Sequence, residues 1–303
     1  MIVLAACFAV VGAASNAAGT AFQRKAASTV AQGGGIRLLL ALVRRPAWLA
    51  GIAGVMGAAL FQALALINGP MALVQPLFIL ELPCALLIAA PLMHRRMPRP
   101  GWWAVGGVVA GLALVLASAA PSGSENQASM VRWVPALAVC LGAMAAAIAV
   151  ARPGRPALFR AAVLAAAAAI GNALTAALLK SATGTLADTG FAAFLRSWQT
   201  YGFALVGVGA LLLLENALQA GPLAASQPAL TIGDATVSLV LGVALFGEEV
   251  RTGWWVVPEL LGAGLILWGV LRLTRVVPQA QQTLAGASAG AAAGAGSGKR
   301  PGR

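Results

Sequence analysis

The chain contains one stretch twice, first as Gly69-Pro70-Met71-Ala72-Leu73-Val74-Gln75-Pro76 and then as Gly221-Pro222-Leu223-Ala224-Ala225-Ser226-Gln227-Pro228. In each copy a Gly-Pro step opens an apolar segment, and a Gln-Pro step follows about one helical turn further on. Downstream, Gly101-Trp102-Trp103 recurs as Gly253-Trp254-Trp255, and both pairs of motifs are 152 residues apart. A fixed offset of this kind indicates an internal repeat of half the chain.

Composition predicts that the chain crosses a membrane many times. Hydrophobic residues make up 60% of the sequence, charged residues 9%, and the mean hydropathy is +0.87. Runs of about 20 apolar residues are long enough to cross the ~30 Å hydrocarbon core of a bilayer as helices. Nine such runs occur, at 2–22, 46–67, 71–92, 101–119, 133–151, 158–180, 199–219, 223–246 and 253–273. We therefore expect an all-α polytopic membrane protein with nine transmembrane helices.

The repeat divides these spans into two groups of four. Residues 1–119 form the first repeat and residues 158–275 the second, because spans two to four match spans seven to nine at an offset of 152 and span one matches span six at 156. The span at 133–151 links the two repeats. Five crossings separate equivalent helices, an odd number, so the second repeat is expected to be inverted, as in alternating-access transporters. The Ala/Gly-rich tail, 276–303, is expected to be disordered.

The distribution of Lys and Arg predicts the orientation. Sixteen of the 20 basic residues fall on one side of the spans, which predicts a cytoplasmic C-terminus and an N-terminus outside the plasma membrane. The formal charge of +12 then lies in short loops beside lipid headgroups, so the lipid bilayer is the expected partner and nucleic acid is not. The outer side holds Arg132, Lys180, Arg196, Arg251 and the loop acids Glu125, Asp188, Glu248 and Glu249. The eight tryptophans fall near span ends, which predicts an aromatic belt.

Carboxylates inside the apolar runs are the first candidate functional residues. They are Glu81, Glu215, Asp234 and Glu259. An Asp at the centre of a membrane helix costs about 2.5–3.5 kcal/mol, so it is expected to have a function. Asp234 lies near the middle of span eight, and Gln227, Thr231 and Ser238 share its helical face, at −7, −3 and +4. We expect this polar stripe to line a cavity that substrate or ion enters.

Span three repeats this design with Gln75, Pro76 and Glu81. Glu81 aligns with Gly233 and not with Asp234, and this slip of one residue rotates its side chain by about 100° unless a kink at Pro76 corrects it. The four prolines of the repeated stretch, Pro70, Pro76, Pro222 and Pro228, are predicted hinges, because an interior proline frees a backbone carbonyl.

Other spans add polar groups that are expected to face the same pathway: Asn16, Asn172, Gln62, Glu215 and Asn216. An alternative role for any of these amides is to join neighbouring helices by hydrogen bonds, each worth about 0.6 kcal/mol. For Glu215 and Glu259, which lie closer to span ends, the alternative is that the carboxylate reaches water. Gly107 and Gly111 are expected to serve helix packing alone.

Catalytic chemistry is not indicated. The three cysteines lie singly in separate spans, His94 lies in a basic loop, and the motifs of serine hydrolases, zinc proteases and P-loop enzymes are absent from the sequence. We therefore expect neither an enzyme nor a bound cofactor.

The repeated stretch, together with Leu245-Phe246-Gly247-Glu248 before Trp254 and a Gly-rich ninth span, resembles the drug/metabolite transporter (DMT) superfamily of EamA-like proteins. The resemblance covers roughly residues 1–275, in two copies. Gln23-Arg24-Lys25 after the first span, with nine spans and an outer N-terminus, is similar to the NIPA-type magnesium transporter branch. The resemblance implies a carrier of small molecules or ions built from inverted repeats. Most relatives have ten spans, whereas nine are counted here.

Three functions are compatible with these residues. The first is a secondary transporter of a small solute, for which Asp234 and Glu81 bind an ion or a proton. The second is a divalent-cation permease, in which the same two carboxylates are Mg²⁺ ligands and hard oxygen atoms replace part of the hydration shell. The third is a non-transporting structural membrane subunit, or an intramembrane enzyme. A homodimer is compatible with the sequence in each case.

Overall fold

The computed structural model describes residues 1–28, 45–92, 99–123, 125–152, 154–221, 223–251 and 253–273. Within these ranges the chain is helical, and the segments between helices form turns and one isolated antiparallel β-bridge, between Ser122 and Glu249. The predicted hinge Pro222 and the tail at 276–303 lie outside the described residues.

Nine helical segments in the described part of the chain are long and apolar enough to cross a membrane. They are Ile2–Phe22, Pro46–Asn68, Met71–Ile88, Arg99–Ala119, Met130–Val150, Ala157–Thr189, Trp198–Ala220, Ser226–Phe246 and Gly253–Leu273. Large apolar side chains are exposed on their outer faces, such as Leu205 (76%) and Val139 (70%). The prediction of a multi-pass, all-α membrane protein is confirmed for the described residues.

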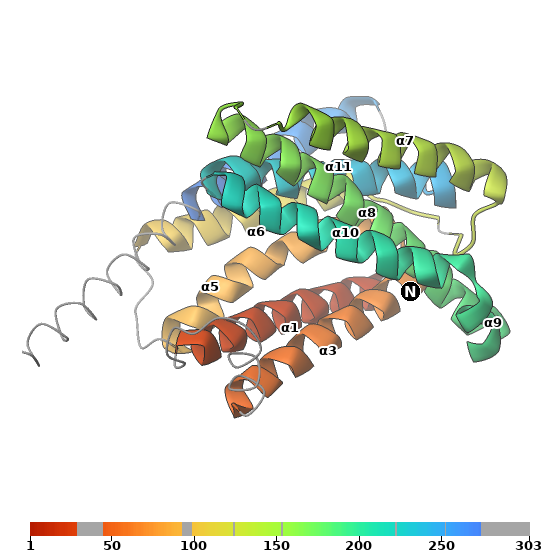
Figure 1. Cartoon of the computed structure of the whole chain (residues 1–303), viewed down its shortest axis with the longest axis horizontal. Helices are drawn as coiled ribbons and strands as arrows, with labels where there is room; N and C mark the ends of the chain where they lie inside the picture. The colour runs from red at the N-terminus through yellow and green to blue at the C-terminus, as the bar shows by residue number, and fades with distance from the viewer. Residues whose placement is uncertain are drawn as a thin grey trace, which may run out of the picture.

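Helices that follow each other in the chain pack side by side in two similar pairs. α1 (Ile2–Ser28) lies along α3 (Pro46–Asn68), and α8 (Ala157–Thr189) lies along α10 (Trp198–Ala220), as Figure 1 shows. The backbones of the first pair approach closely, because a Cβ added to Gly19 would lie 2.8 Å from the Gly51 carbonyl oxygen. Small residues therefore decide where these helices cross.

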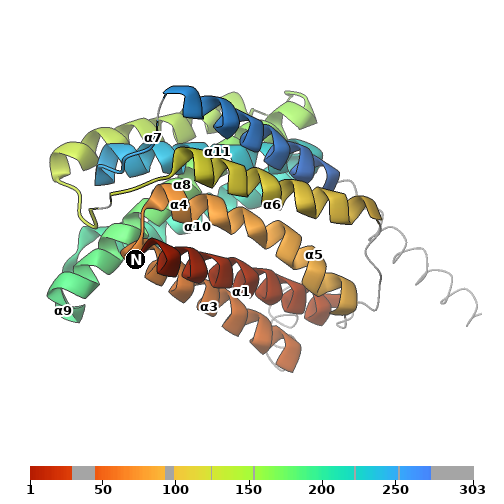
Figure 2. The ribbon, with the colours of Figure 1, turned by 180° about the vertical axis from the view of Figure 1, so that it is seen from behind.

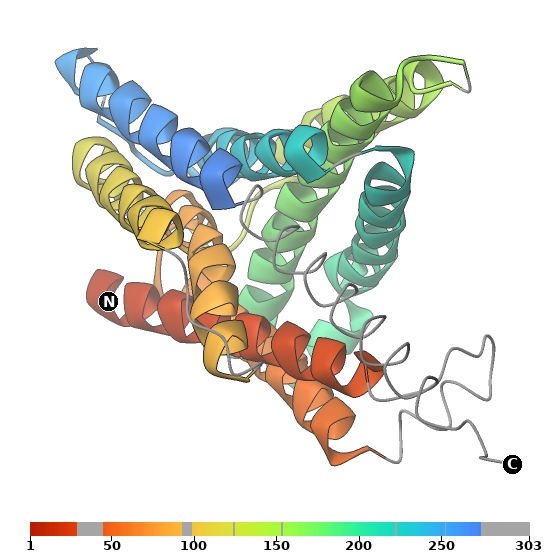
Figure 3. The same ribbon diagram turned by 90° about the vertical axis from the view of Figure 1, so that its left-hand side faces the viewer.

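A third pair joins α6 (Arg99–Ala119) to the C-terminal span, Gly253–Leu273, which begins with the short helix η2 (Gly253–Trp255). The two lie next to each other on one side of the bundle (Figures 2 and 3). A Cβ on Gly111 would lie 2.6 Å from the Gly262 carbonyl oxygen, and one on Gly107 would lie 2.8 Å from the Trp268 ring. The expected packing role of Gly107 and Gly111 is confirmed.

α8 is the most buried helix and lies in the centre of the bundle (Figure 3). It contacts α10, α11 (Leu223–Phe246), α7 (Met130–Val150), α3 and α4 (Met71–Leu77). Alanine fills much of its surface, which favours the helix and lets its neighbours approach. It runs to Thr189, well past the apolar run expected to end at residue 180, and turns at Gly190 (φ 88°) into the short α9, Phe191–Arg196. Lys180 therefore lies inside a helix and not at its end.

Contacts in the first half of the chain recur in the second half. A Cβ on Gly69 would meet Ala5, and a Cβ on Gly221 would meet Ala161, which are the equivalent positions at offsets of 152 and 156. In the same way Gly19 lies against Val55, and Gly207 against Thr175. The α1–α3 and α8–α10 pairs thus cross at equivalent residues.

Span three is not one continuous helix. It consists of α4, the 3-10 turn η1 (Phe78–Leu80) and α5 (Glu81–Leu92). Two prolines bracket the turn, since Pro76 and Pro83 lack the N–H groups that would bond the carbonyls of Ala72 and Ile79 in an α-helix. The Glu81 N–H instead bonds the Phe78 carbonyl, closing the tighter 3-10 turn.

One tryptophan does not belong to the expected aromatic belt. Trp133, in the first turn of α7, has a fully buried side chain. Its ring packs edge-on against Trp198, with centroids 5.2 Å apart, and against Phe246 at 6.4 Å. Such edge-to-face contacts add to the apolar burial. Trp133 is therefore a core residue, which corrects its predicted position at the lipid interface.

Candidate functional site

The polar stripe of α11 lies on a partly buried face. Gln227, Thr231 and Asp234 are half-buried and Ser238 is buried. The Ser238 hydroxyl donates to Asp234 Oδ1 at 3.4 Å, so these two side chains meet one turn apart as their spacing predicts. A second buried hydroxyl, that of Ser226, has no hydrogen-bond partner within the described residues. The face thus combines a carboxylate with neighbouring polar groups, and Ser226 adds a buried hydroxyl beside it.

Span three carries its own polar groups on both sides of η1. Gln75, in the last turn of α4, is 5% exposed, and its Nε2 has no hydrogen-bond partner among the described residues. Glu81, the first residue of α5, is half-buried. A buried amide donor without an acceptor is costly, by about 1–3 kcal/mol, unless a ligand or water accepts from it.

The 3-10 turn changes where Glu81 points. A 3-10 residue advances about 120° and ~2.0 Å along the axis, whereas an α-helical residue advances about 100° and ~1.5 Å. Over the three residues of η1, the difference amounts to about 60° and ~1.5 Å. The axial gain equals the rise of one α-helical residue, and the rotation recovers more than half of the 100° slip. In ideal geometry the break therefore shifts Glu81 along the axis toward the position that Asp234 has in α11, and about 40° of the rotation remains.

The remaining predicted site residues divide into two groups. Asn16 on α1, Gln62 on α3 and Asn172 on α8 are half-buried, as expected for residues between helices. Glu215 and Asn216 are exposed on α10, and Asn216 Nδ2 donates to the Leu212 carbonyl of its own helix at 2.7 Å. This amide does not join two helices in the described structure. Glu259, on the C-terminal span, is half-buried.

The four predicted hinges have different surroundings. Pro70 precedes α4 as its N-cap residue in an extended conformation, and Pro76 is a buried residue inside α4. Pro228 lies inside α11, which continues through it as an α-helix. Among the three hinges that the structure describes, Pro70, Pro76 and Pro228, only Pro76 is followed by a break in the helix.

Within the residues that the structure describes, no group of three or more His, Cys, Asp and Glu residues is placed to hold a metal ion. Asp234 and Glu81, the predicted ligands of a cation permease, are not part of such a group. A cation at either carboxylate would take its other ligands from amide, hydroxyl or carbonyl oxygens.

A buried ion pair is the feature that sequence reasoning missed. Lys180 Nζ donates to Glu248 Oε1 at 2.7 Å, and neither side chain is exposed. The same carboxylate accepts the backbone N–H groups of Met71 at 2.6 Å and Ala72 at 2.8 Å, in the first turn of α4. Lys180 also lies 4.5 Å from the centroid of the Phe246 ring. The sequence places Glu248 in a loop and Lys180 at the end of a span, and the correction is that both are buried against each other inside the bundle.

This ion pair joins segments far apart in the chain. α4 precedes α7, whereas Lys180 in α8 and Glu248 after α11 follow it. Taking one partner away from a buried pair leaves an uncompensated charge and costs about 3–5 kcal/mol. One sequence signal was available, because the residues after Lys180 up to Gly190 contain no proline and thus allow the helix to continue.

The loop at 120–129 covers the same end of the bundle. Ser122 and Glu249 exchange backbone hydrogen bonds of 2.9 and 2.8 Å, and Gln127 Nε2 donates to the Ser181 carbonyl at 2.9 Å. Arg132 donates to the Leu245 carbonyl at 3.1 Å and forms a more exposed ion pair with Glu125 at 3.4 Å. These bonds fix the segment that carries Glu248.

One known protein is similar to nearly the whole chain. It is an uncharacterized protein of Corynebacterium glutamicum, strain ATCC 13032, 26% identical over 288 residues, which cover 94% of this chain and 98% of its own length. No family model matches the chain. No solved structure matches it either. The similarity therefore extends over the whole length of both chains without assigning an activity to either.

Proposed function

We propose that the protein is a secondary membrane transporter of the DMT type, which moves a small solute or ion by alternating access between two inverted repeats. The recurring contacts support the repeats, since Gly69 with Ala5 and Gly221 with Ala161 are equivalent pairs in the two halves. Two similar halves around a central region give two alternative closures of nearly equal energy.

The observation that carries the proposal is the pair of carboxylates inside the spans, Asp234 and Glu81. The 3-10 turn of span three, by ideal geometry, offsets the one-residue slip along the axis. This supports a carboxylate at a similar depth in each copy. Interior ionisable groups in a membrane protein typically mark an ion or proton pathway. Gln75 Nε2 and Ser226 Oγ have no hydrogen-bond partner among the described residues, which supports a polar ligand nearby.

The buried ion pair fits this proposal as the closed outer end of the pathway. It connects α4 of the first repeat to α8 and the segment after α11 of the second. Opening that end requires α4 to move away from Glu248, which breaks two backbone hydrogen bonds. The state described here is then closed to the outside.

Orientation is tested separately. With the N-terminus outside and the C-terminus in the cytoplasm, a reporter fused after Arg275 is active on the cytoplasmic side and a reporter within 121–130 on the outer side. Equal behaviour of the two fusions would contradict an odd number of crossings between them and with it the inverted repeat.

Transport is tested by a proteoliposome uptake screen. Mg²⁺, organic cations, amino acids and sugars are compared with and without a pH gradient. Accumulation that follows the gradient assigns a proton-coupled transporter. Mg²⁺ uptake that is the same with and without the pH gradient indicates the cation permease instead.

Asp234→Asn is the decisive variant. It should abolish transport or its coupling while folded yield stays near wild type, because neutralising the carboxylate is not a packing loss. Glu81→Gln should show the same kind of defect. Asp188→Asn, an exposed carboxylate at the end of α8, is the matched control and should transport normally. Normal uptake and coupling in both Asp234→Asn and Glu81→Gln would remove these residues from the pathway.

A further inference from the structure

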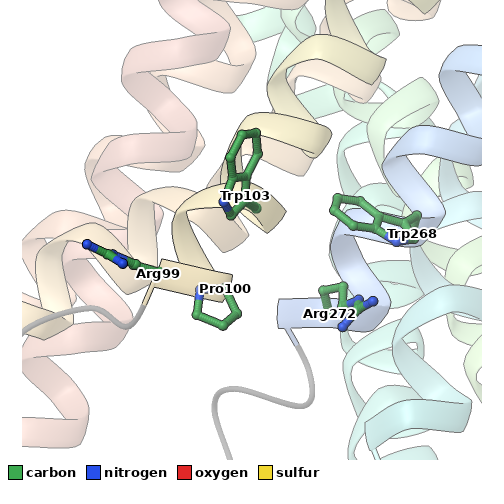
Figure 4. Close-up of a pocket in the computed structure, with 5 residues that line it drawn as sticks. All are labelled: Arg99, Pro100, Trp103, Trp268 and Arg272. Atoms are coloured by element: carbon green, nitrogen blue, oxygen red, sulfur yellow. The ribbon is translucent and has the colours of Figure 1, made fainter.

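A cavity of about 530 Å³ lies between the beginning of α6 and the end of the C-terminal span (Figure 4). It is lined by Arg99, Pro100, Trp103, Trp268 and Arg272. Two of these five residues are cationic and none is acidic. Trp103 and Trp268 come from the two helices on either side, Arg272 lies below Trp268, and the Arg99 side chain points away from Arg272 (Figure 4).

Helix packing explains why the cavity forms there. The two helices are antiparallel neighbours, and their glycines hold the backbones together around Gly107 and Gly111. The close contact continues to Gly269, whose Cβ would lie 2.8 Å from the Ala104 carbonyl oxygen. Beyond this contact the ends of the two helices and the side chains of Trp103 and Arg272 border an open space. The outcome is a groove at the end of the bundle, open to the surroundings.

The electrostatics of the groove favour an anion. The Arg272 guanidinium lies 5.6 Å from the centroid of the Trp268 ring, a cation–π contact that positions its charge. α6 is 21 residues long and begins at Arg99, so the positive end of its dipole adds to the two arginines. Both arginines are exposed. Arg272 already borders the groove, and the Arg99 side chain has to turn toward it to reach the same ligand.

The position of the groove identifies the source of that anion. The C-terminal span begins at the end of the bundle that contains the Lys180–Glu248 pair, since Arg251 donates its backbone N–H to the Ala119 carbonyl at 3.0 Å. The groove is at the opposite end, where most basic residues of the sequence fall. Tryptophan at that depth lies beside lipid headgroups, and the Trp103 ring is 76% exposed.

We propose that this groove binds the phosphate of an anionic phospholipid headgroup, with Arg99 and Arg272 on the phosphate and Trp103 beside the first part of the acyl chains. Basic pockets between membrane helices on the cytoplasmic side are suited to such lipids. The site is separate from the transported solute and does not depend on the transport proposal.

The test uses the full-length protein in phosphatidylcholine nanodiscs, with phosphatidylglycerol added at increasing fractions. After the protein is released from the nanodiscs, native mass spectrometry counts the phosphatidylglycerol molecules that remain bound to it. Tryptophan fluorescence also reports binding. A basic residue near the membrane surface contributes about 1 kcal/mol, which is about fivefold in affinity. We expect Arg272→Gln and Arg99→Gln each to weaken phosphatidylglycerol binding about fivefold, and the double variant about 25-fold.

Matched controls separate the groove from general charge. Arg155→Gln removes an exposed arginine from another loop on the same side, and should leave lipid binding unchanged. Trp103→Leu should weaken binding, whereas Trp102→Leu, a neighbouring exposed tryptophan outside the groove, should not. An equal loss in Arg155→Gln would overturn the site in favour of diffuse attraction.

Inorganic phosphate distinguishes a lipid from a soluble anion. If millimolar phosphate does not displace phosphatidylglycerol, the acyl chains contribute and the lipid is the ligand. If phosphate alone changes the Trp fluorescence and competes fully, the groove binds a soluble anion and the lipid assignment is wrong.

Discussion

Spans three and eight are two copies of one sequence element, yet only the second is a continuous helix. Both contain Gln-Pro at equivalent positions, Gln75-Pro76 and Gln227-Pro228. α11 continues through Pro228, whereas span three changes to a 3-10 turn directly after α4. A single interior proline is thus not sufficient to break a membrane helix of this kind.

Two differences between the copies account for this. Span three has a second proline at Pro83, and the equivalent position in span eight is Ala235. The first turn of α4 is also fixed by the Glu248 carboxylate, whereas the position equivalent to Glu248 in the first half is Arg96. Span three therefore lacks two backbone N–H groups, and the first turn of its helix α4 is held by the Glu248 carboxylate. Each of these two differences can be changed by mutation.

The largest effect is expected from Lys180→Met, which removes the cation that neutralises the anchor of α4. The buried Glu248 charge is left unpaired, so the free energy of unfolding should fall by about 3–5 kcal/mol. Thermal denaturation in detergent, followed by size-exclusion chromatography, measures the loss. The double variant Lys180→Met with Glu248→Gln should be more stable than the single one, because the buried charge is gone and the amide oxygen still accepts one of the two N–H groups. A double variant that is no better would show that charge compensation is not the role of Lys180.

Ala235→Pro should give α11 the second proline that span three has. It removes one backbone hydrogen bond inside the helix and should destabilise the protein by about 3 kcal/mol or somewhat less, since neighbouring groups partly satisfy a freed carbonyl in a membrane helix. The same denaturation assay measures this loss of stability, and Ala235→Val is the control for side-chain size. Wild-type stability of Ala235→Pro would mean that the paired prolines do not distinguish the two copies.

Pro83→Ala should restore the N–H that the Ile79 carbonyl lacks and favour a continuous helix. The Glu81 side chain would then rotate back about the helix axis by about 60° and shift back along it by ~1.5 Å. Stability should change by less than about 1 kcal/mol, while uptake falls as in Glu81→Gln. Pro135→Ala, which removes an interior proline of α7, is the control and should transport normally. Full transport activity of Pro83→Ala would show that transport does not depend on the position of Glu81.

The smallest effect is expected from Ser226→Ala in α11. The buried hydroxyl has no partner among the described residues, so its removal should leave the melting temperature unchanged or raise the free energy of unfolding by up to about 1 kcal/mol. Thr183→Ala is a suitable contrast, because its hydroxyl donates to the Leu179 carbonyl at 2.7 Å. A clear loss of stability in Ser226→Ala would indicate a partner for this hydroxyl.

Features that depend on residues close together in the chain could be predicted from the sequence. The nine spans follow from local hydropathy, and the contacts of Gly107 and Gly111 follow from small residues at helical spacing. The meeting of Asp234 with Ser238 also depends only on residues one turn apart.

Long-range contacts could not be predicted in this way. Glu248 follows the last apolar residue of a span, where a solvated loop acid is the usual outcome, and its burial depends on residues 68 and 177 positions away. Trp133 was assigned to the interface because it begins a span, but the rings that cover it come from α10 and α11. Comparison of the copies shows that Pro83 has no counterpart at Ala235, but it does not show that the two prolines bracket a 3-10 turn.

The ion pair also constrains how the protein is made. Glu248 is synthesised 68 residues after Lys180 and 177 residues after Met71, which is about 3–14 s and about 9–35 s at ordinary ribosomal rates of ~5–20 residues per second. During that interval the lysine is already inserted without its carboxylate, and the first turn of α4 has no anchor. The early helices must therefore stay in the membrane until the segment that carries Glu248 is made, and a chain that ends between residues 180 and 248 carries Lys180 without this carboxylate.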